Sequence, residues 1–493
     1  MILSFKGHDY KYAVEQIMLT MFPSERPEYT DVLRDGESSA AVNLSRGAVW
    51  TTASTKLVTD GRISRASARA KTEELRGELA FDRLCQRIIK LSFYRAAVKI
   101  TGEKPEWGAL TGIRPGKIAS NMIERGMSPG KTARALERIY YVSPERSALC
   151  VKAAESGLRI KRSLGERDIC LYAGIPFCPT RCAYCSFVSS SVEKSFKLID
   201  PFLKALSLEI RAAAEIAQEL GLRVISVYIG GGTPTTLSAC QLTELILGIR
   251  SSFCIEDGCE FTVEAGRPDT ITPEKLSAMA ESGVNRISIN PQTMQMSVLE
   301  TIGRKHTPED TVKAFEAARG AGFKNINMDM IAGLPGDTLQ GFERSINEVL
   351  KMSPENITVH TLSRKRGARI TEENTLIPSG EEVGKMLDYA NTGLEKKGYL
   401  PYYLYRQKFT SGGFENVGWC RKSNENIYNV CIMEELCTVL ALGGGGSTKM
   451  VEAKSGRIER IFNPKYPLEY IKNIDGVIEN KKRIKLFNRE DNR

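Results

Sequence analysis

The chain has 493 residues, of which 42% are hydrophobic, 26% charged and 8% aromatic. These proportions exclude a disordered chain, a collagen and a disulfide-rich miniprotein. No run of eighteen apolar residues occurs, which excludes a membrane span. The charged residues among the first twenty exclude a secretory signal, and neither end shows a lipidation motif. We therefore expect a cytoplasmic protein with no membrane partner.

At about 150 residues per domain, the length predicts two to four domains or one large barrel with additions.

The net charge of +10 is unevenly distributed along the chain. Residues 1–165 contain 28 Lys and Arg against 18 Asp and Glu, whereas residues 166–493 contain 41 of each. This change in charge balance along the chain predicts a domain boundary near 165. A basic domain attracts nucleic acid, an acidic partner or a polycarboxylate, or is only a solvated surface. Nucleic-acid binding stays an alternative, although no binding motif or aromatic-interleaved basic strip supports it.

The first 165 residues have the pattern of a mixed α+β domain. Helical spacing covers 13–22 and 69–100, and two short apolar segments, 40–45 and 48–52, predict strands on either side of a turn at Arg46-Gly47.

From 166 to 397, short β-branched runs alternate with helical segments. Predicted strands lie at 169–175, 224–229, 260–264, 286–290, 326–331 and 356–361. Predicted helices lie at 193–220, 239–251, 273–282, 308–321, 339–351 and 380–397. Six such units predict an α/β fold with a parallel sheet. The spacing favours a partial TIM-type (β/α)6 barrel, with a doubly wound open sheet as the alternative.

Residues 398–493 predict a mixed C-terminal extension that covers the substrate. The segment 402–408 is aromatic and basic, and the apolar run 439–442 before Gly443–Gly446 predicts a strand or turn in a folded domain.

Three of the twelve cysteines are clustered and nine are scattered. The scattered ones are typical of small buried hydrophobic residues: Cys85, Cys150, Cys170, Cys240, Cys254, Cys259, Cys420, Cys431 and Cys437. Cys178, Cys182 and Cys185 form a C-x3-C-x2-C loop just after the first predicted barrel strand. Three thiolates can wrap one soft metal centre. A structural zinc normally has four ligands, and Cys170 lies at the far end of the strand. On a four-iron cube, three ligands leave one iron open to a chelating small molecule.

Polar residues follow the other predicted strands. The glycine-rich segment 230–235 permits close approach of a ligand to the backbone, whose amides can bind a carboxylate or whose carbonyls can hold an ammonium group. Glu264, Gln292, Arg304 and Asp329 lie at or near the ends of later strands. Barrel enzymes place their active sites at this end of the sheet, so these residues are predicted to share a site.

The cysteine spacing resembles that of the radical S-adenosylmethionine (SAM) enzymes. Further motifs resemble the oxygen-independent coproporphyrinogen III oxidases: Tyr172-x-x-Ile-Pro-Phe-Cys178, Gly230-Gly-Gly-Thr-Pro-Thr235, Arg286-Ile-Ser-Ile-x-x-Gln292, Ile302-Gly-Arg-x-His306 and Asn327-Met-Asp-Met-Ile-Ala-Gly-Leu-Pro-Gly336. Five others are similar to the longer HemZ-type coproporphyrinogen dehydrogenases: Trp107-Gly-x-Leu-Thr-Gly-Ile-Arg-Pro-x-Lys117, Thr358-Val-His-Thr-Leu362, Tyr403-Leu-Tyr-Arg-Gln-Lys408, Glu415-Asn-Val-Gly418 and Asn463-Pro-Lys465. The resemblance thus covers nearly the whole chain.

The resemblance implies a role for each motif residue. Cys178, Cys182 and Cys185 would hold a [4Fe-4S] cluster, with Tyr172 and Tyr184 beside the cluster and bound SAM. The SAM-binding residues would be Gly231, Gly232, Thr233, Glu264, Gln292, Arg304 and Asp329. The family is thought to bind two SAM molecules, and these residues are not divided between them. No catalytic side chain is assigned.

The implied reaction needs one electron from a low-potential donor, flavodoxin-like or ferredoxin-like. A 5′-deoxyadenosyl radical then takes a hydrogen from the β-carbon of a propionate, and loss of CO2 and one electron leaves a vinyl group. Two such events convert coproporphyrinogen III to protoporphyrinogen IX in haem biosynthesis. Basic side chains would anchor the carboxylates of this tetrapyrrole, the candidates being Arg364, Lys365, Arg366, Arg406 and Lys408.

The sequence also departs from the haem-forming oxidases. Gly174 replaces a usual His, Phe187 replaces a frequent fourth Cys, and Asn290-Pro291 replaces Gly-Val. A haem chaperone of the same family and a radical SAM enzyme with another substrate therefore stay open.

Overall fold

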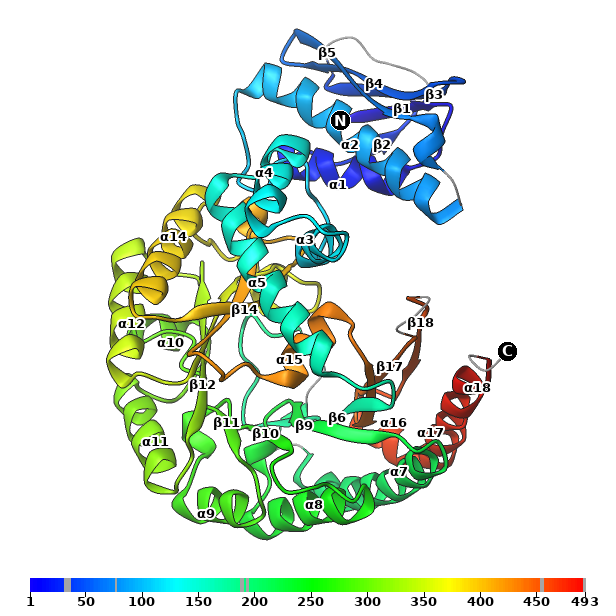
Figure 1. Cartoon of the computed structure of the whole chain (residues 1–493). Helices are drawn as coiled ribbons and strands as arrows, with labels where there is room; N and C mark the ends of the chain where they lie inside the picture. The colour runs from blue at the N-terminus through cyan, green and yellow to red at the C-terminus, as the bar shows by residue number, and fades with distance from the viewer. Residues whose placement is uncertain (31–36, 76–77, 187–189, 192–194, 453–455, 491–493) are drawn as a thin grey trace. The chain divides into compact units, whose positions relative to one another are not determined.

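The computed structural model (Figure 1) describes residues 1–30, 37–75, 78–186, 190–191, 195–452 and 456–490. The chain divides into two compact units. The first contains Met1–Pro115, Asn121–Val151 and Gly412–Phe414, and the second contains Gly116–Ser120, Lys152–Ser411 and Glu415–Arg493. The three-part division predicted at 165 and 397 stays a prediction.

The first unit is built on a five-stranded sheet in the order β2-β1-β3-β4-β5. Its strands are β1 (Ile2–Lys6), β2 (Glu28–Tyr29), β3 (Ser39–Arg46), β4 (Trp50–Thr59) and β5 (Arg62–Lys71). Two helices, α1 (Lys11–Met21) and α2 (Glu78–Thr101), share one apolar core with the sheet. The helices α3 (Pro115–Glu124), α4 (Pro129–Tyr140) and α5 (Pro144–Ser163) follow in the chain.

The prediction of a continuous helix over 69–100 is wrong at its beginning. Residues 62–71 form β5, in which Ser64, Ala68 and Ala70 are buried while Arg65, Arg69 and Lys71 are exposed. Small residues on alternate positions fit the inner face of a strand. They carry too little apolar bulk for this alternation to be recognised in the sequence.

The second unit contains the predicted barrel. Six parallel strands lie side by side in chain order, and an outer helix follows each (Figure 1). The strands are β6 (Asp168–Ile175), β9 (Arg223–Gly231), β10 (Glu260–Glu264), β11 (Arg286–Ser288), β12 (Asn325–Ala332) and β13 (Asn356–Thr361). The helices are α7 (Ile199–Glu219), α8 (Ala239–Ser252), α9 (Pro273–Glu281), α11 (Pro308–Gly320), α12 (Leu339–Met352) and α14 (Gly380–Lys396). Because neighbouring strands are consecutive in the chain, the partial (β/α)6 barrel is confirmed and the doubly wound alternative is wrong.

The C-terminal extension lengthens this sheet at both edges. β14 (Leu400–Arg406) and β15 (Glu415–Cys420) continue it beyond β13, with β15 antiparallel to β13. β16 (Thr438–Gly443), parallel to β6, continues it at the other edge with β17 (Ser447–Val451) and β18 (Ile458–Phe462). The remaining helices of the extension are α15 (Ile427–Glu434), α16 (Pro467–Lys472), α17 (Ile474–Lys481) and α18 (Arg483–Glu490). Shorter elements of the second unit are β7 (Phe177–Cys178), β8 (Ser190–Ser191), α10 (Met296–Thr301) and α13 (Arg369–Glu372).

Local sequence fixes where the outer helices begin. The side chain of a Ser or Thr caps five of them by accepting a hydrogen bond from a backbone N–H of the first turn. These capping residues are Ser238, Thr272, Thr307, Thr338 and Ser379. Each cap therefore ends the loop that starts at the carboxyl end of the preceding strand, which keeps those loops in place around the site.

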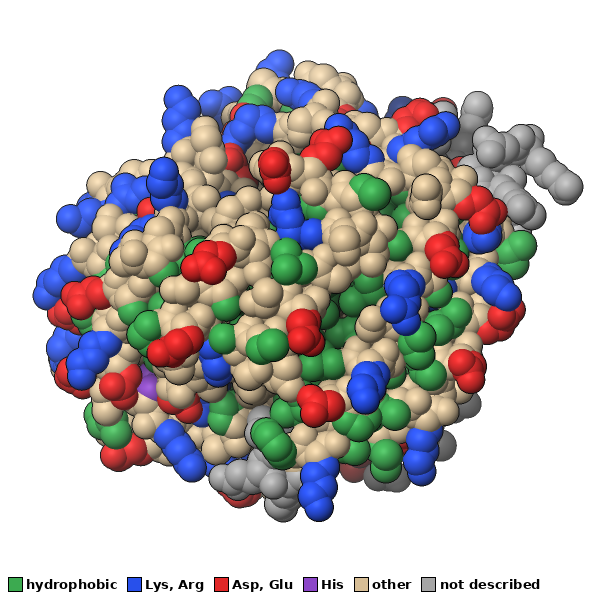
Figure 2. All heavy atoms as spheres, turned by 90° about the horizontal axis from the view of Figure 1, so that it is seen from below, with side chains coloured by type: hydrophobic (Ala, Val, Ile, Leu, Met, Phe, Trp, Pro, Cys, Tyr) green, Lys and Arg blue, Asp and Glu red, His purple; other side chains and the backbone are tan. Residues whose placement is uncertain are grey.

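The surface of the barrel carries mixed charge. On the face shown in Figure 2, basic and acidic side chains are interspersed, in keeping with the balanced composition of residues 166–493. Within the part of the chain that the structure describes, every helix is too short or too polar to pass through a lipid bilayer.

A buried ion pair holds the C-terminal helices to the barrel. The Lys481 ammonium of α17 lies 3.0 Å from Oε1 of Glu209 in α7, and both side chains are fully buried. The Tyr470 hydroxyl donates to Glu209 at 2.6 Å, Asn463 Nδ2 donates at 2.8 Å, and the Gly443 N–H donates at 2.7 Å. Glu209 thus binds residues from four places in the C-terminal extension around one buried charge.

Removing the lysine alone is expected to destabilise the protein strongly. In Lys481→Ala the Glu209 carboxylate stays buried without its counter-charge, which costs about 3–5 kcal/mol of the free energy of unfolding. Calorimetry should show a lower unfolding midpoint than in the control Lys482→Ala, whose side chain is 62% exposed. The double variant Glu209→Gln/Lys481→Met should recover much of the loss; equal midpoints for all variants would contradict this role.

Candidate functional site

A cavity of about 370 Å³ lies at the carboxyl ends of the barrel strands. It collects eleven of the twelve residues predicted to form the metal and cofactor site. They are Cys178, Cys182, Cys185, Tyr184, Gly231, Gly232, Thr233, Glu264, Gln292, Arg304 and Asp329. The strand ends of a barrel converge in this way because parallel strands all point their carboxyl ends to the same side.

The three loop cysteines are half-buried at one wall of the cavity. Cys178 accepts a hydrogen bond from the Thr233 hydroxyl at 3.5 Å. The Cys182 sulfur lies 3.7 Å from Nη1 of Arg267, a guanidinium that Asp269 holds by an ion pair of 3.1 Å. Hydrogen bonds to sulfur stabilise the thiolate form, which is the form that binds metal.

The spacing of these sulfurs distinguishes between the two metal alternatives. In the described residues, the three loop thiols do not form a group with all sulfurs within 4.8 Å of one another. Thiolates on a single zinc ion come closer than that, since Zn–S is about 2.3 Å. A cube places its three thiolates on three different irons and so keeps the sulfurs farther apart. The donor set therefore fits a [4Fe-4S] cluster better than zinc.

The glycine segment after β9 packs tightly against the cysteine loop. Gly231 has a φ of 115°, and a Cβ there would lie 2.7 Å from the Ile175 nitrogen. A Cβ on Gly232 would lie 2.5 Å from the Phe177 oxygen and 2.9 Å from the Cys178 sulfur. No residue larger than glycine fits at either position without displacing the backbone that carries Cys178.

The expectation that the amides of this glycine segment bind a ligand carboxylate is wrong for two of them. The N–H groups of Gly232 and Thr233 donate to the carbonyls of Ile175 and Phe177, both at 2.7 Å. The amides therefore secure the loop rather than a ligand.

Two carboxyl groups in the cavity have opposite pKa shifts. Burial, reinforced by the charge of Asp329 and opposed by Arg304, raises the pKa of Glu264 to about 8. Burial also acts to raise the pKa of Asp329, but the hydrogen bond and charge of His360, with help from Asn327, hold it below its ordinary value. His360 Nε2 lies 3.6 Å from Asp329 Oδ2. Near neutral pH, Glu264 thus keeps its proton while Asp329 is ionised.

Arg304 connects the cysteine loop to the strand ends. Its Nη1 donates to the carbonyls of Gly266 and Asn290 at 2.9 and 3.0 Å, and its Nη2 donates to the Tyr184 hydroxyl at 3.1 Å. The side chain is 7% exposed, and among the described residues its Nε has no hydrogen-bond partner. A buried cation in the lining of a cavity suits a ligand carboxylate.

Gln292 occupies a strained backbone position. Its φ of 68° lies in the left-handed region, which non-glycine residues rarely adopt. Its N–H donates to the Asp329 carbonyl at 2.9 Å, and its carbonyl accepts from the Ile331 N–H at 3.0 Å. Strain of this kind persists where neighbouring contacts enforce it, and it is concentrated at functional sites.

Tyr172 is the predicted site residue that does not line the cavity. Its ring packs with those of Tyr228 and Tyr428 at centroid distances of 6.4 and 6.0 Å. Gly174 faces the carbonyl of Gly444, in the turn just after the neighbouring strand β16, since a Cβ on Gly174 would lie 2.7 Å from that oxygen. The expected departure at Phe187 lies outside the described residues.

Of the five predicted carboxylate anchors, only Lys365 lines the cavity, and burial lowers its pKa. Arg364 donates to Asn374 at 2.8 Å. Arg406 is buried beside its cross-strand partner Glu415, and burial lowers its pKa to about 10. Lys408 and Arg366 are not among the lining residues.

The sequence analysis assigned no site role to several side chains of this cavity, among them Arg267, Asn290, His360, Tyr403 and Tyr405. A signal existed for Arg267, which follows a predicted strand end, and for His360, which lies inside a predicted strand. The tyrosines reach the site through the antiparallel addition of β14 and β15, which no local pattern announces.

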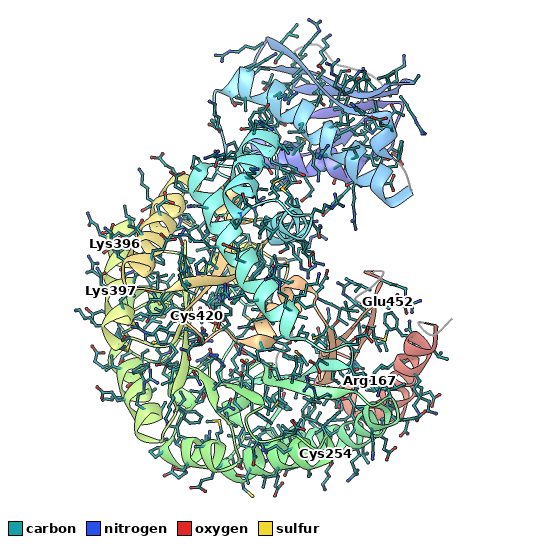
Figure 3. The ribbon with its side chains drawn as sticks, in the orientation of Figure 1. Arg167, Cys254, Lys396, Lys397, Cys420 and Glu452 are labelled. Carbon is teal, nitrogen blue, oxygen red and sulfur yellow. The ribbon has the colours of Figure 1, made fainter. Side chains whose placement is uncertain are left out.

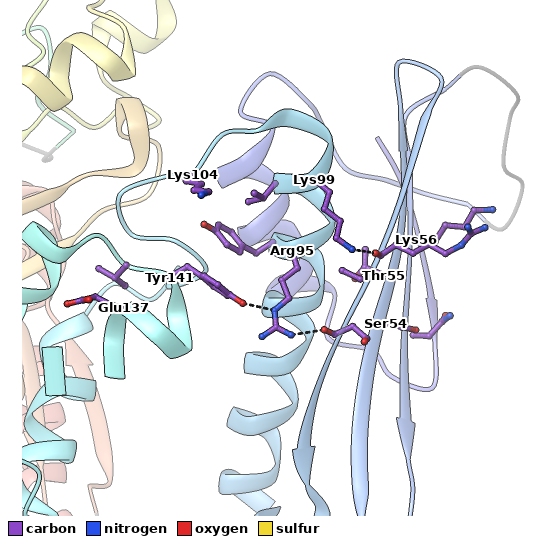
Figure 4. A pocket seen from close by; sticks show the side chains of 15 residues that line it. Ser54, Thr55, Lys56, Arg95, Lys99, Lys104, Glu137 and Tyr141 are labelled. Atoms are coloured by element: carbon purple, nitrogen blue, oxygen red, sulfur yellow. Dashed lines mark hydrogen bonds between the residues drawn. The ribbon is translucent and has the colours of Figure 1, made fainter. Parts of the chain in front are cut away.

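A second cavity, of about 1070 Å³, lies in the first unit (Figure 4). Arg95 donates to the Tyr141 hydroxyl at 2.9 Å and to the Ser67 carbonyl at 2.7 Å, and Lys99 donates to the Arg65 carbonyl at 2.8 Å. None of the predicted site residues lies there, so the larger cavity is separate from the predicted chemistry.

Comparisons with known proteins agree with the geometry. Residues 172–349 match the model of the radical SAM superfamily. The chain is 39% identical over 375 residues to the oxygen-independent coproporphyrinogen-III oxidase-like protein HemZ of Bacillus subtilis, with 75% of each chain covered. It is 36% identical over 258 residues to the heme chaperone HemW of the same organism, covering 50% of this chain and 64% of that protein. These findings confirm the predicted family resemblance.

A solved structure is similar as well. Coproporphyrinogen III oxidase HemN from Escherichia coli matches with a TM-score of 0.53 at 23% identity, over 65% of this chain and 72% of that chain. This likeness supports the radical SAM fold.

The raised pKa of Glu264 predicts a pH-dependent stability of the cofactor-free chain. Between the ordinary value of 4.5 and about 8, the folded chain keeps a proton that the unfolded chain releases, so the free energy of unfolding falls as pH rises. Glu264→Gln should remove this loss and be more stable than wild type by on the order of 2 kcal/mol at pH 9. Thermal unfolding from pH 5 to pH 9 measures it, with exposed Glu281→Gln as control; parallel curves would refute the assignment.

Proposed function

Because this chain belongs to the radical SAM superfamily, we propose that it oxidatively decarboxylates propionate side chains of coproporphyrinogen III, giving the vinyl groups of protoporphyrinogen IX. The cofactors of the superfamily are a [4Fe-4S] cluster and SAM. When bound, they supply a 5′-deoxyadenosyl radical that abstracts a hydrogen atom. The protein binds and orients the reactants and excludes water.

The convergence of the strand-end residues on one cavity is the observation that carries this proposal. Cys178, Cys182 and Cys185 hold the cluster, and Arg304 offers its cation to the carboxylate of SAM. Protonated Glu264 can donate a hydrogen bond as well as accept one, which suits a ribose hydroxyl. Ionised Asp329 attracts the positive charge that SAM carries.

The substrate would enter from the side of Lys365. The cavity volume of about 370 Å³ is at the small end of the range for ligand sites. The cavity therefore accommodates a SAM-sized ligand. The tetrapyrrole ring would stay at the opening of the cavity and insert a single propionate side chain into it. Lys365, Tyr403 and Tyr405 line the wall that this arm would contact. A flavodoxin-like or ferredoxin-like protein is the proposed electron donor.

A second candidate function is haem transfer, which the similarity to HemW favours. It predicts that haem binds to the chain and that no vinyl group forms. The HemZ similarity covers a larger share of this chain and favours decarboxylation.

An anaerobic assay tests the proposal. The reconstituted protein, coproporphyrinogen III, SAM and dithionite should yield protoporphyrinogen IX and CO2. One SAM is reduced to methionine and 5′-deoxyadenosine for each propionate oxidised to vinyl, which balances the two electrons. Cys182→Ser should lose the cluster, measured as iron content and the electron paramagnetic resonance signal, and should form neither product. Cys254→Ser removes an exposed thiol that lies outside the cysteine loop, and this variant should behave as wild type.

The products distinguish the alternatives. SAM cleavage without protoporphyrinogen would show that another substrate is used. Tight binding of haem without decarboxylation would establish the second candidate, and a full cluster in Cys182→Ser would overturn the metal assignment.

A further inference from the structure

A second group of three cysteines lies apart from the cavity. Cys170 is in β6, Cys431 is in α15, and Cys437 immediately precedes β16. Their sulfurs all lie within 4.8 Å of one another, and Cys170 and Cys437 are 3.8 Å apart. All three are buried free thiols. The fold thus gathers into one cluster three cysteines that the sequence presents as scattered.

The spacing is that of ligands to a single ion. With a metal–sulfur bond of about 2.3 Å, two thiolates on one tetrahedral or trigonal ion lie about 3.8–4.0 Å apart. The Cys170–Cys437 distance matches this value before any metal is bound. Among the described residues, the three loop cysteines of the cavity do not form such a group, so the two sets of cysteines differ in spacing.

The surroundings limit which ions fit. Around the three thiols are apolar side chains, including Val439, Ile160, Ile225 and Leu436. In the residues that the structure describes, no His, Asp or Glu joins the group as a fourth donor. Soft thiolate donors select Zn(II) and Cu(I) among common ions. The lack of a fourth donor favours Cu(I). Three thiolates carry a smaller net charge with Zn(II) than with Cu(I), and the apolar environment therefore favours Zn(II).

We propose that Cys170, Cys431 and Cys437 form a buried three-thiolate site for one soft metal ion. Each thiol gives its proton to solvent as it binds the ion, and no redox step is involved. The bound ion connects the first barrel strand to the helix and strand that extend the sheet at that edge. It therefore acts as a structural clamp, separate from the cluster of the cavity.

The test uses the full-length chain with Cys178→Ser, Cys182→Ser and Cys185→Ser, which has no competing loop thiols. Under anaerobic conditions it is titrated with Zn(II) alone or with Cu(I) alone, each buffered by a chelating indicator. We expect one equivalent of one of these ions per chain and a higher unfolding midpoint in its presence. Additional Cys170→Ala should weaken binding more than about tenfold.

Cys420→Ala is the matched control. Cys420 is 1% exposed, lies in β15 in the interior of the second unit (Figure 3) and is not part of the group. It should keep full metal binding. Equal binding in the Cys170→Ala and Cys420→Ala chains would overturn the proposal, as would no stoichiometric binding.

A second measurement does not depend on folding of the alanine variant. X-ray absorption at the edge of the bound zinc or copper in the otherwise unaltered holoprotein should show about three sulfurs near 2.3 Å. A shell made mainly of nitrogen or oxygen would contradict the site. The cluster iron is counted separately, so failure of this proposal would leave the proposed function untouched.

Discussion

The close approach of the glycine segment after β9 to the strand that carries the cysteine loop sets the geometry of the site. Gly231 and Gly232 leave no room for a Cβ against Ile175, Phe177 and the Cys178 sulfur. The N–H groups of Gly232 and Thr233 are used in this contact, at 2.7 Å each. The beginning of the loop that presents three thiols is therefore fixed by backbone packing against the glycine segment after β9.

From this fixed wall, the charges of the site follow a simple arrangement. Glu264 lies where burial keeps it protonated, and Asp329 lies where His360 keeps it ionised. Two carboxyl groups with separated pKa values can serve different purposes within one cavity. Arg304 lies between the cysteine loop and the strand ends. It donates hydrogen bonds to the carbonyls of Gly266 and Asn290 and to the Tyr184 hydroxyl. It is a structural tie that also brings a positive charge to the cavity.

The sequence predicted those features of the fold and the site that depend on patterns between neighbouring residues. Consecutive strand and helix patterns gave the barrel order, and the cavity residues lie at the ends of those strands because parallel strands end on one side. What it could not predict depends on contacts between distant segments. Examples are β5, whose small residues hide its alternation, and Tyr405, which reaches the site only because β15 pairs antiparallel to β13.

The two cysteine groups illustrate the same limit. Spacing along the chain identified Cys178, Cys182 and Cys185, because all three lie in one short loop and are therefore close in space. Cys170 and Cys437 are separated by 267 positions and meet because β16 adds in parallel to β6, with Cys170 opposite Val439. A parallel addition at a sheet edge is decided by the whole extension, including the buried Glu209–Lys481 pair that holds its end. Cysteines that appear scattered in a sequence therefore have to be judged by the strands they lie on.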